Sequence, residues 1–352
     1  MNLNNLLEQK SALIQLGKVL NLTIQHDNWP GYSCGIEEQE FLAFKLAVKK
    51  ASVVNPWFSD QMISSSLKAW CDNFTEENLD KWLGNYSGLN SKNNKTVLII
   101  CAGNLPMVGW HDILCCFIYG YSVKVKLSSD DNILIPAIVS LLQLFYPEIK
   151  DRVHFLKSKP ENYDLVIATG SNNSNRYFDY YFGDLPHIFR NNRTSIAVLD
   201  HSTTKTELEN LADDIFQYYG LGCRSVTKLY LPKGYDIDKL FKSVFKYKNV
   251  VNHNKYMNNY DYNRSIYLLQ NIKFLDNGFL ILKESEDLFS PVSVVNYEFY
   301  KDLDILEAKI KLNSAAIQCR VGLGGIPFGS AQKPKLWDYA DGVDTMNFLN
   351  EN

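Results

Sequence analysis

The stretch TVLIICAGNLPMVGWHDILCCFIYGYSVKVKL, residues 96–127, contains two short β-branched runs separated by a longer apolar segment. The two runs have the composition of buried strands, and the segment between them, 108–120, has the length of a helix. The alternation continues with a helix expected over 131–146 and strands expected over 163–168 and 195–200. Short strands that alternate with helices predict an α/β fold built on a parallel, doubly wound sheet.

The region before this alternation has a different pattern. Apolar residues in 37–54 and 59–74 recur at the spacing of amphipathic helices, and the polar stretch 87–95 predicts a break before the first strand. We therefore expect a helical N-terminal region in front of the α/β part.

Composition excludes several classes of protein. The chain has 352 residues, with 36 basic and 39 acidic side chains and a formal net charge of −3, so no electrostatic footprint for nucleic acid is present. Its seven cysteines form no CxxC or Cys/His cluster, and the first twenty residues lack an apolar signal core. No window approaches 18 uncharged apolar residues. These features predict a cytoplasmic protein without a membrane span, a structural metal or a nucleic-acid partner.

Three loops at the ends of the expected strands are the first candidates for a binding site. They follow Ala102, Leu127 and Ala168, and ligands of doubly wound sheets bind at the carboxyl ends of the strands. None of these loops contains a GxGxxG pattern. A dinucleotide would therefore be held differently from the standard pyrophosphate cradle.

Cys223 is the candidate nucleophile. It lies in YYGLGCRSVTKLYLP, residues 218–232, where a helical run ends in Gly220 and Gly222 and a strand-like run follows. A thiol in a glycine-rich turn can approach a substrate closely, and backbone N–H groups and Arg224 can favour its thiolate. The other reading is that Cys223, like most cysteines, is a small buried hydrophobe.

Several motifs together resemble the aldehyde dehydrogenase superfamily. They occur in the order GNLP (103–106), GYSVKVKLSS (120–129), ATGS (168–171), GLGCRSVTKLYL (220–231) and DLFSPV (287–292). Within it, the chain is most similar to the acyl-CoA reductase family that includes the long-chain fatty acyl-CoA reductase of bacterial luminescence. NPWFS at 55–59 and FGSAQKPKLWDYADGVDTMNFL at 328–349 also fit that branch, and the resemblance covers roughly residues 37 to 350.

The resemblance implies an aldehyde-dehydrogenase-like fold with a Rossmann-type cofactor lobe, an α/β catalytic lobe and a helical N-terminal region. The implied parts are N-terminal helices and an NAD(P)-binding lobe (1–192), a catalytic lobe with the cysteine (193–320), and a C-terminal segment (321–352) that returns to the cofactor lobe or to an oligomer seam. A homo-oligomer is expected.

The resemblance also implies roles for individual residues. Cys223 becomes the nucleophile, and Asn104 becomes the amide that holds the oxyanion of the reacting carbonyl. The implied cofactor-binding residues are Lys126, Ser128, Gly170, Ser171, Asp287 and Phe289. Other interpretations remain for Asn104 as a turn residue and for Asp287 as part of the solvated charge run KESED.

Two departures from the superfamily pattern define the expected reaction. Phe189 or Arg190 stands where oxidising members carry a glutamate base, so no carboxylate is available there to activate water. Ser129 stands where NAD-dependent members often carry glutamate, which favours NADPH and leaves NADH as the alternative. His187 and His201 flank the first region and could serve as an acid or base.

The resulting hypothesis is an acylating NAD(P)H-dependent reductase. It would convert a fatty acyl-CoA, or an acyl-carrier thioester, to the aldehyde through an acyl-cysteine intermediate. Two other functions stay open: a cysteine-dependent acyl-CoA thioesterase or acyltransferase, and a non-catalytic assembly or carrier-binding module.

Overall fold

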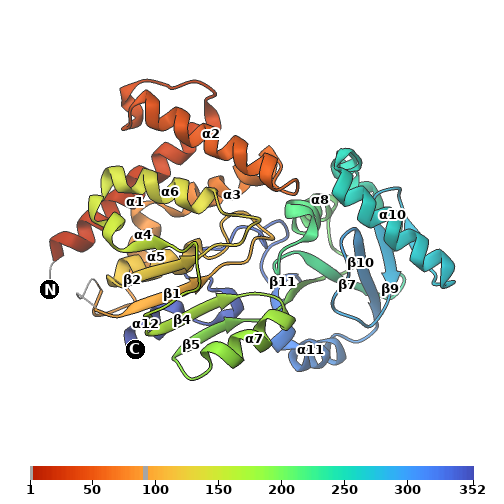
Figure 1. Cartoon of the computed structure of the whole chain (residues 1–352). Coiled ribbons are helices and arrows are strands. Elements are labelled where there is room, and N and C mark those ends of the chain that lie inside the picture. Colours follow the sequence, from red (N-terminus) through yellow and green to blue (C-terminus); the bar gives the residue numbers. More distant parts are fainter. Residues whose placement is uncertain (1–2, 90–93) are drawn as a thin grey trace. The chain divides into compact units, whose positions relative to one another are not determined.

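The computed structural model describes residues 3–89 and 94–352, and it divides the chain into two compact units (Figure 1). The first unit comprises the chain up to Asn191 together with Lys335–Asn352, and the second comprises Asn192–Pro334. Each unit is built on its own sheet with helices packed against it, so the predicted α/β class is confirmed. Part of the predicted polar break at 87–95 lies outside the described residues.

The first unit contains a five-stranded parallel sheet in the order β3-β2-β1-β4-β5. The strands are β1 (Thr96–Ile100), β2 (Ser122–Lys126), β3 (Val153–Phe155), β4 (Leu165–Thr169) and β5 (His187–Arg190). Strand β1 lies at the centre of the sheet and pairs with β2 on one edge and with β4 on the other. From β1 the chain first adds strands on one side, β2 and β3, and then on the other, β4 and β5. Loops that follow these central strands therefore emerge together at the carboxyl edge of the sheet.

Helices cover both faces of this sheet. Along the chain they are α5 (Trp110–Tyr119), α6 (Leu134–Phe145) and α7 (Asn172–Phe182). Helix α7 packs Phe178 and Phe182 against Leu98, Val166 and Ala168 on one face. Helix α5 packs against β1 and β2, and nearly all its side chains are buried because it is covered on its outer side as well.

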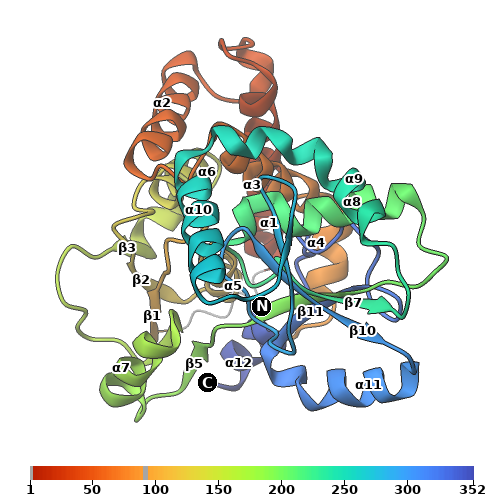
Figure 2. The ribbon, with the colours of Figure 1, turned by 90° about the vertical axis from the view of Figure 1, so that its right-hand side faces the viewer.

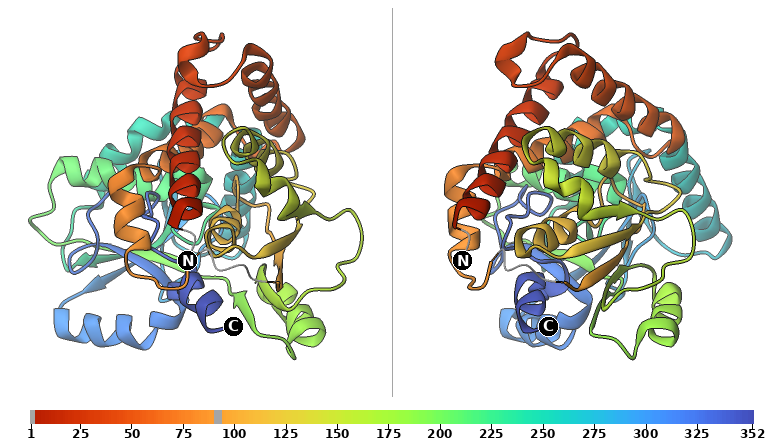
Figure 3. Two further views of the ribbon diagram at one scale, coloured as in Figure 1. Left: turned by 90° about the vertical axis from the view of Figure 1, so that its left-hand side faces the viewer. Right: turned by 60° about the vertical axis from the view of Figure 1, so that its left-hand side comes forward.

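The N-terminal region is helical, as the sequence predicted. Its helices are α1 (Leu3–Gln25), α2 (Glu38–Val54), α3 (Asp60–Asn73) and α4 (Glu76–Leu83). Helices α1 and α2 pack against α6, and α1 also packs against α3 (Figure 3, red and orange). The region thus extends the helical layer of the first unit.

The C-terminal segment is tied to the first unit by a buried ion pair. Asp112 of α5 pairs with Arg190 of β5, and both side chains are about 95% buried. The hydroxyl of Thr345, in helix α12 (Thr345–Glu351), donates to the Asp112 carboxylate at 3.2 Å and accepts from Arg190 at 3.1 Å. Arg190 also donates to the carbonyl of Ala340 at 2.7 Å. Removal of one partner from a buried ion pair strongly destabilises a protein. The bonds of Thr345 and Ala340 to this pair therefore hold α12 and the chain before it against α5 and β5.

An aromatic cluster surrounds His111 in the same region. The rings of Trp82 and Tyr339 lie 5.7 and 5.2 Å from the imidazole, centroid to centroid, and Trp70 lies 6.2 Å away. Burial lowers the pKa of His111 to about 4. The imidazole is therefore neutral in the folded protein near pH 7.

The second unit contains a six-stranded sheet in the order β11-β6-β7-β10-β9-β8. The strands are β6 (Thr194–Val198), β7 (Val226–Pro232), β8 (Leu275–Asp276), β9 (Ile281–Glu284), β10 (Val294–Tyr300) and β11 (Ile317–Gly322). Only the β8–β9 pair is antiparallel among the strand pairs of the described chain. Helices α8 (Lys205–Phe216), α9 (Ile237–Val244), α10 (Asn254–Leu269) and α11 (Leu303–Leu312) surround this sheet (Figure 2).

The aromatic-rich stretches take two different positions. In α10, Tyr256, Tyr260 and Tyr267 are buried against the second sheet. In α7, Tyr177 and Tyr180 point to solvent, with exposed fractions of 66% and 82%. Among the described residues, no helix is both long and apolar enough to cross a membrane.

The buried imidazole predicts a specific loss of stability in acid. Between pH 6.5 and about pH 4, the unfolded chain binds a proton at His111 but the folded chain does not. The contribution of His111 to the free energy of unfolding therefore falls as the pH is lowered through this range. The unfolding free energy of the wild type relative to His111→Gln should fall by up to about 3 kcal/mol over this range. Urea unfolding at several pH values measures this difference.

Other titrating groups cancel in that comparison. Burial raises the pKa of Asp131 and of Asp214 to about 6, but both carboxyls are present in wild type and variant. A difference that stays constant between pH 6.5 and 4 would contradict a neutral, buried His111.

Candidate functional site

The loop after β1 carries Asn104 and fits closely against the loop after β2. A Cβ atom on Gly103 would lie 2.6 Å from Oγ of Ser128 and 2.9 Å from Cβ of Asp130, so only glycine fits. Asn104 itself is exposed. The structure thus brings Asn104 and Ser128, two of the predicted site residues, to neighbouring loops at the carboxyl edge of the first sheet.

Two buried side chains hold the Asn104 loop in place. Asp131 is 4% exposed, and its Oδ2 accepts a hydrogen bond from the backbone N–H of Met107 at 2.6 Å. Met107 has a φ of 64°, a left-handed conformation that is uncommon for a residue with a side chain. The amide of Asn55, from the NPWFS motif, donates to the carbonyls of Gly103 at 3.4 Å and Asp130 at 3.3 Å.

The two lysines of β2 have different surroundings. Lys124 donates to the carbonyls of Glu161 and Asn162 at 2.7 and 3.0 Å, so it stabilises the chain before β4. Lys126, at the carboxyl end of the strand, is half-buried, and its side chain makes no hydrogen bond or ion pair with any described residue. Lys126 is therefore the one whose ammonium is available to a ligand.

The loop after β4 also requires glycine. A Cβ atom on Gly170 would lie 2.7 Å from Cβ of Ser174 and 3.0 Å from the ring of Phe178. Ser171 is the N-cap of α7, and its hydroxyl accepts from the backbone N–H of Ser174 at 3.2 Å. Gly170 therefore lets the loop pack directly against the first turn of α7, whose N-terminus favours anions.

Cys223 lies in the second unit, in a turn just before β7, and is half-buried. The turn is closed by the N–H of Ser225, which donates to the carbonyl of Gly222 at 3.0 Å. The buried hydroxyl of Ser195, in β6, donates to the carbonyl of Cys223 at 2.9 Å. The same Ser195 Oγ lies 3.0 Å from Sγ of Cys319 and accepts from its N–H at 3.2 Å. Ser195 thus ties the cysteine turn to β11.

The segment after β11 supports the other side of this turn. Gln332 donates to the hydroxyl of Ser225 at 3.2 Å, and Arg224 donates to the carbonyl of Ala331 at 3.4 Å. The segment is itself held by Asp214, whose fully buried carboxylate accepts from the N–H groups of Gly329 and Ala331 at 2.6 and 2.9 Å. The thiol position is therefore fixed by contacts on two sides of its turn.

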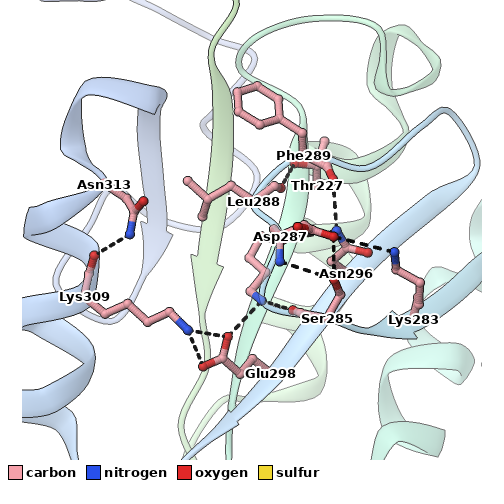
Figure 4. A network of polar contacts seen from close by, with 11 residues as sticks. Thr227, Lys283, Ser285, Asp287, Leu288, Phe289, Asn296, Glu298, Lys309 and Asn313 are labelled. Carbon is pink, nitrogen blue, oxygen red and sulfur yellow. Dashed lines mark hydrogen bonds and ion pairs between the residues drawn. The ribbon is translucent and has the colours of Figure 1, made fainter.

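Asp287 and Phe289 lie in the loop between β9 and β10 (Figure 4). The Asp287 carboxylate is 74% exposed, accepts from Ser285 Oγ at 2.8 Å and lies 3.9 Å from the ammonium of Lys283. Phe289 is 44% exposed. This loop is joined to the strand that follows Cys223, because Thr227 Oγ1 of β7 donates to the carbonyl of Leu288 at 2.7 Å.

Strand β5 provides no carboxylate. Its residues are His187, Ile188, Phe189 and Arg190, and Arg190 is engaged in the buried ion pair with Asp112. The ring of His187 stacks on Phe189 at 3.9 Å, and its Nδ1 lies 2.7 Å from the carbonyl of Leu185.

Two of the cavities that the described residues form lie each within a single unit. One, beside Tyr219 and Tyr256 in the second unit, measures about 20 Å³, which is room for about one water and too little for an acyl chain. The other, of about 360 Å³, lies along β5 in the first unit and is lined by His187, Phe189 and Asn175, among others. No cluster of three or more potential metal ligands occurs among the described residues.

The predicted site residues fall into two groups. Asn104, Lys126, Ser128, Gly170 and Ser171 gather at the carboxyl edge of the first sheet. Cys223, Asp287 and Phe289 belong to the second unit. The sequence did not identify the side chains that position these loops: Asn55, Asp131, Ser195, Asp214, Thr227 and Gln332. The only indication in the sequence is that each is a polar residue in or near an apolar run or a motif.

Comparisons with known proteins identify the fold. No protein-family model and no curated protein sequence matches the chain. Among solved structures, an indole-3-acetaldehyde dehydrogenase in complex with NAD+ matches with a TM-score of 0.59 and 12% identity over 89% of this chain and 71% of its own. An oxidoreductase from Marinobacter aquaeolei matches with a TM-score of 0.61 and 9% identity over 89% and 73%.

A third match covers the most of both chains among these three. It is aldehyde dehydrogenase 21 from Physcomitrella patens in complex with the reaction product succinate, with a TM-score of 0.58 and 10% identity over 96% of this chain and 84% of its own. The chain therefore has the aldehyde dehydrogenase-like fold. At these identities the likeness shows the fold alone.

The contact between Ser195 and Cys223 can be tested by Ser195→Ala. The substitution leaves the carbonyl of Cys223 without its donor, which should lower the unfolding free energy by about 1–3 kcal/mol and change the rate at which Cys223 reacts with iodoacetamide. Urea unfolding and peptide mapping measure the two effects.

Cys319→Ala is the matched control for that substitution. It removes the thiol next to Ser195 but keeps the Ser195–Cys223 hydrogen bond, so both effects should be smaller. If both variants behaved alike, Ser195 would not position the turn.

Proposed function

We propose that this protein is an acylating, NAD(P)H-dependent reductase that converts a fatty acyl-CoA, or an acyl-carrier thioester, to the aldehyde. The observation that carries the proposal is the turn at 222–225, which presents a half-buried cysteine at the start of a strand in an aldehyde dehydrogenase-like fold. The resemblance of its motifs to the acyl-CoA reductase family supports the choice of substrate.

The chemistry assigned to the second unit is nucleophilic. The Cys223 thiolate attacks the carbonyl carbon of the thioester, the bond to the CoA sulfur breaks, and CoA leaves as its thiolate. A bound nicotinamide cofactor would supply the hydride that reduces the acyl group. Collapse of the resulting thiohemiacetal breaks its bond to Sγ and releases aldehyde with the Cys223 thiolate. Asn104 would donate its amide N–H to the oxygen that becomes negatively charged in these steps.

The residues of the first unit fit a dinucleotide. Gly103 lets the loop after β1 pack closely on Ser128, and Gly170 lets the loop after β4 pack closely on Ser174 of α7. Lys126 and the hydroxyl of Ser128 would bind the adenosine ribose, and Ser171 at the N-terminus of α7 would face the pyrophosphate. Asp287 and Phe289 are proposed for the nicotinamide ribose.

Reduction is favoured over hydrolysis by the composition of β5. An oxidising enzyme of this fold needs a base that activates water, and none of the four side chains of β5 is a carboxylate. An acyl group on Cys223 would then persist until a hydride or a thiol reacts with it. A thioesterase or acyltransferase remains the alternative, and it would release CoA without consuming NAD(P)H.

NADPH is the proposed donor, with NADH as the alternative. Ser129 is exposed where a glutamate would repel a 2′-phosphate. Asp131 is not exposed to such a phosphate, because its carboxylate is buried against Met107. Asp130 is the one exposed acid beside Ser129.

The proposal includes a homo-oligomer in the cytoplasm. Light scattering of the purified protein measures the stoichiometry.

Cys223→Ala should abolish NADPH oxidation that depends on acyl-CoA, because no other thiol occupies this turn. Absorbance at 340 nm with short, medium and long acyl-CoAs measures the rate and the chain-length preference. Cys319→Ala is the control and should keep most of the activity. Activity that persisted in Cys223→Ala would contradict the mechanism.

Asn104→Ala should lower kcat by about 10² to 10³ while the dissociation constant of NADPH stays within about twofold. The Asn104 amide is proposed to stabilise negative charge that develops on the carbonyl oxygen during the reaction. Its loss should therefore lower turnover more than cofactor affinity. Steady-state kinetics and a fluorescence titration with NADPH separate the two. An unchanged kcat would reject the assignment.

A further inference from the structure

Lys228 in β7 is a lysine whose side chain has no exposure to solvent. Charged side chains are almost never fully buried unless they are paired. Burial lowers the pKa of Lys228, and a hydrogen bond to Glu298 of β10 at 3.0 Å acts in the opposite direction. Its ammonium also donates to the backbone carbonyl of Ser285. Lys228, whose burial is costly, thus binds Glu298 and also the loop that carries Asp287.

The same loop is held at three further carbonyls (Figure 4). Asn296 of β10 donates through one amide nitrogen to the carbonyls of Asp287 and Phe289, both at 3.0 Å. Thr227 donates to the carbonyl of Leu288 at 2.7 Å. Side chains of β7 and β10 therefore bind four carbonyls of this loop, although Asp287 and Phe289 are themselves exposed.

The donors come from two adjacent strands in fixed register. Asn296 of β10 pairs with Lys228 of β7, and β7 begins three residues after Cys223. The shape of the Asp287 loop is therefore set by this pair of strands, and the first of them directly follows the cysteine turn. We call the four donors and acceptors Lys228, Thr227, Asn296 and Glu298 the loop clamp.

We propose that Lys228 is a positioning residue: through the carbonyl of Ser285 it fixes the loop in which Asp287 and Phe289 bind the nicotinamide ribose. The inference rests on the proposed function, which assigns the cofactor to this loop. Lys228 touches neither substrate nor cofactor in this account. It holds the loop, and with it the exposed carboxylate of Asp287, in one position. The loop therefore loses little conformational entropy when the cofactor binds.

Lys309 of α11 provides a matched control. Its ammonium donates to both oxygens of Glu298, at 2.7 and 2.8 Å, and makes no hydrogen bond or ion pair with the described residues of the loop. Both lysines lower the pKa of Glu298, although burial alone would raise it. Lys228→Met and Lys309→Met therefore both remove a partner of Glu298, but only the first removes a bond to the loop.

The experiment compares these two variants with the wild type by hydrogen exchange and by NADPH binding. In Lys228→Met, amide exchange at 285–290 should accelerate at least tenfold, and the dissociation constant of NADPH, from a fluorescence titration, should rise about tenfold. In Lys309→Met both should stay within twofold of the wild type, even if the melting temperature falls. Lys228→Arg, which keeps the charge, should restore part of the affinity.

Thr227→Val covers the case in which Lys228→Met does not fold. It removes the bond to Leu288 without changing a charge, and it should affect exchange and NADPH binding in the same direction.

Three results would decide against the inference or its basis. Unchanged exchange at 285–290 in both Lys228→Met and Thr227→Val would overturn the role of the clamp. Faster exchange with unchanged NADPH affinity would show that the loop does not serve the cofactor, and it would also overturn the inference. A wild type that binds NADPH but reduces no acyl-CoA would contradict the proposed reaction alone, because exchange and binding still decide the role of Lys228.

Discussion

Buried polar side chains that hydrogen-bond to the backbone of loops determine the shape of both candidate sites. Strands supply backbone partners to one another, but the loops that join them do not. Asp131 provides this partner for the loop of Asn104, and Ser195 provides it for the turn of Cys223. Thr227 and Asn296 do the same for the loop of Asp287. If these bonds were lost, the sheets could remain while the site residues lost their fixed positions.

The same constraint applies to the exposed residues of the proposed site. Asn104 and Asp287 are both exposed, and each lies in a loop whose backbone is held by buried side chains. Their positions depend on the backbone beneath them, which is fixed by residues that are 0–6% exposed, such as Asn55, Asp131 and Lys228. Preorganised dipoles stabilise developing charge without a cost of reorganisation during the reaction. On the proposed function, these buried residues would act on the chemistry through the loops that they position.

The sequence predicted the parts of the fold that depend on local pattern. The alternation in 96–127 correctly gave β1, α5 and β2, because strand and helix periods are local. It also gave the α/β class, and the motifs gave the aldehyde dehydrogenase-like fold. The sequence did not reveal the loop clamp. Lys228 has the appearance of a solvated charge in a strand, and only the register of β7 against β10 places it beside Glu298 and Ser285. Such contacts depend on pairing between distant segments, which no local pattern encodes.

The central claim is that Cys223 carries the acyl group. The most direct test is to incubate the protein with an acyl-CoA in the absence of NADPH, digest it, and locate the added acyl mass by mass spectrometry. Our account predicts one acyl group on the peptide that contains Cys223, and its loss with release of aldehyde when NADPH is added. An acyl group on another cysteine, or no acyl group with any chain length, would contradict it.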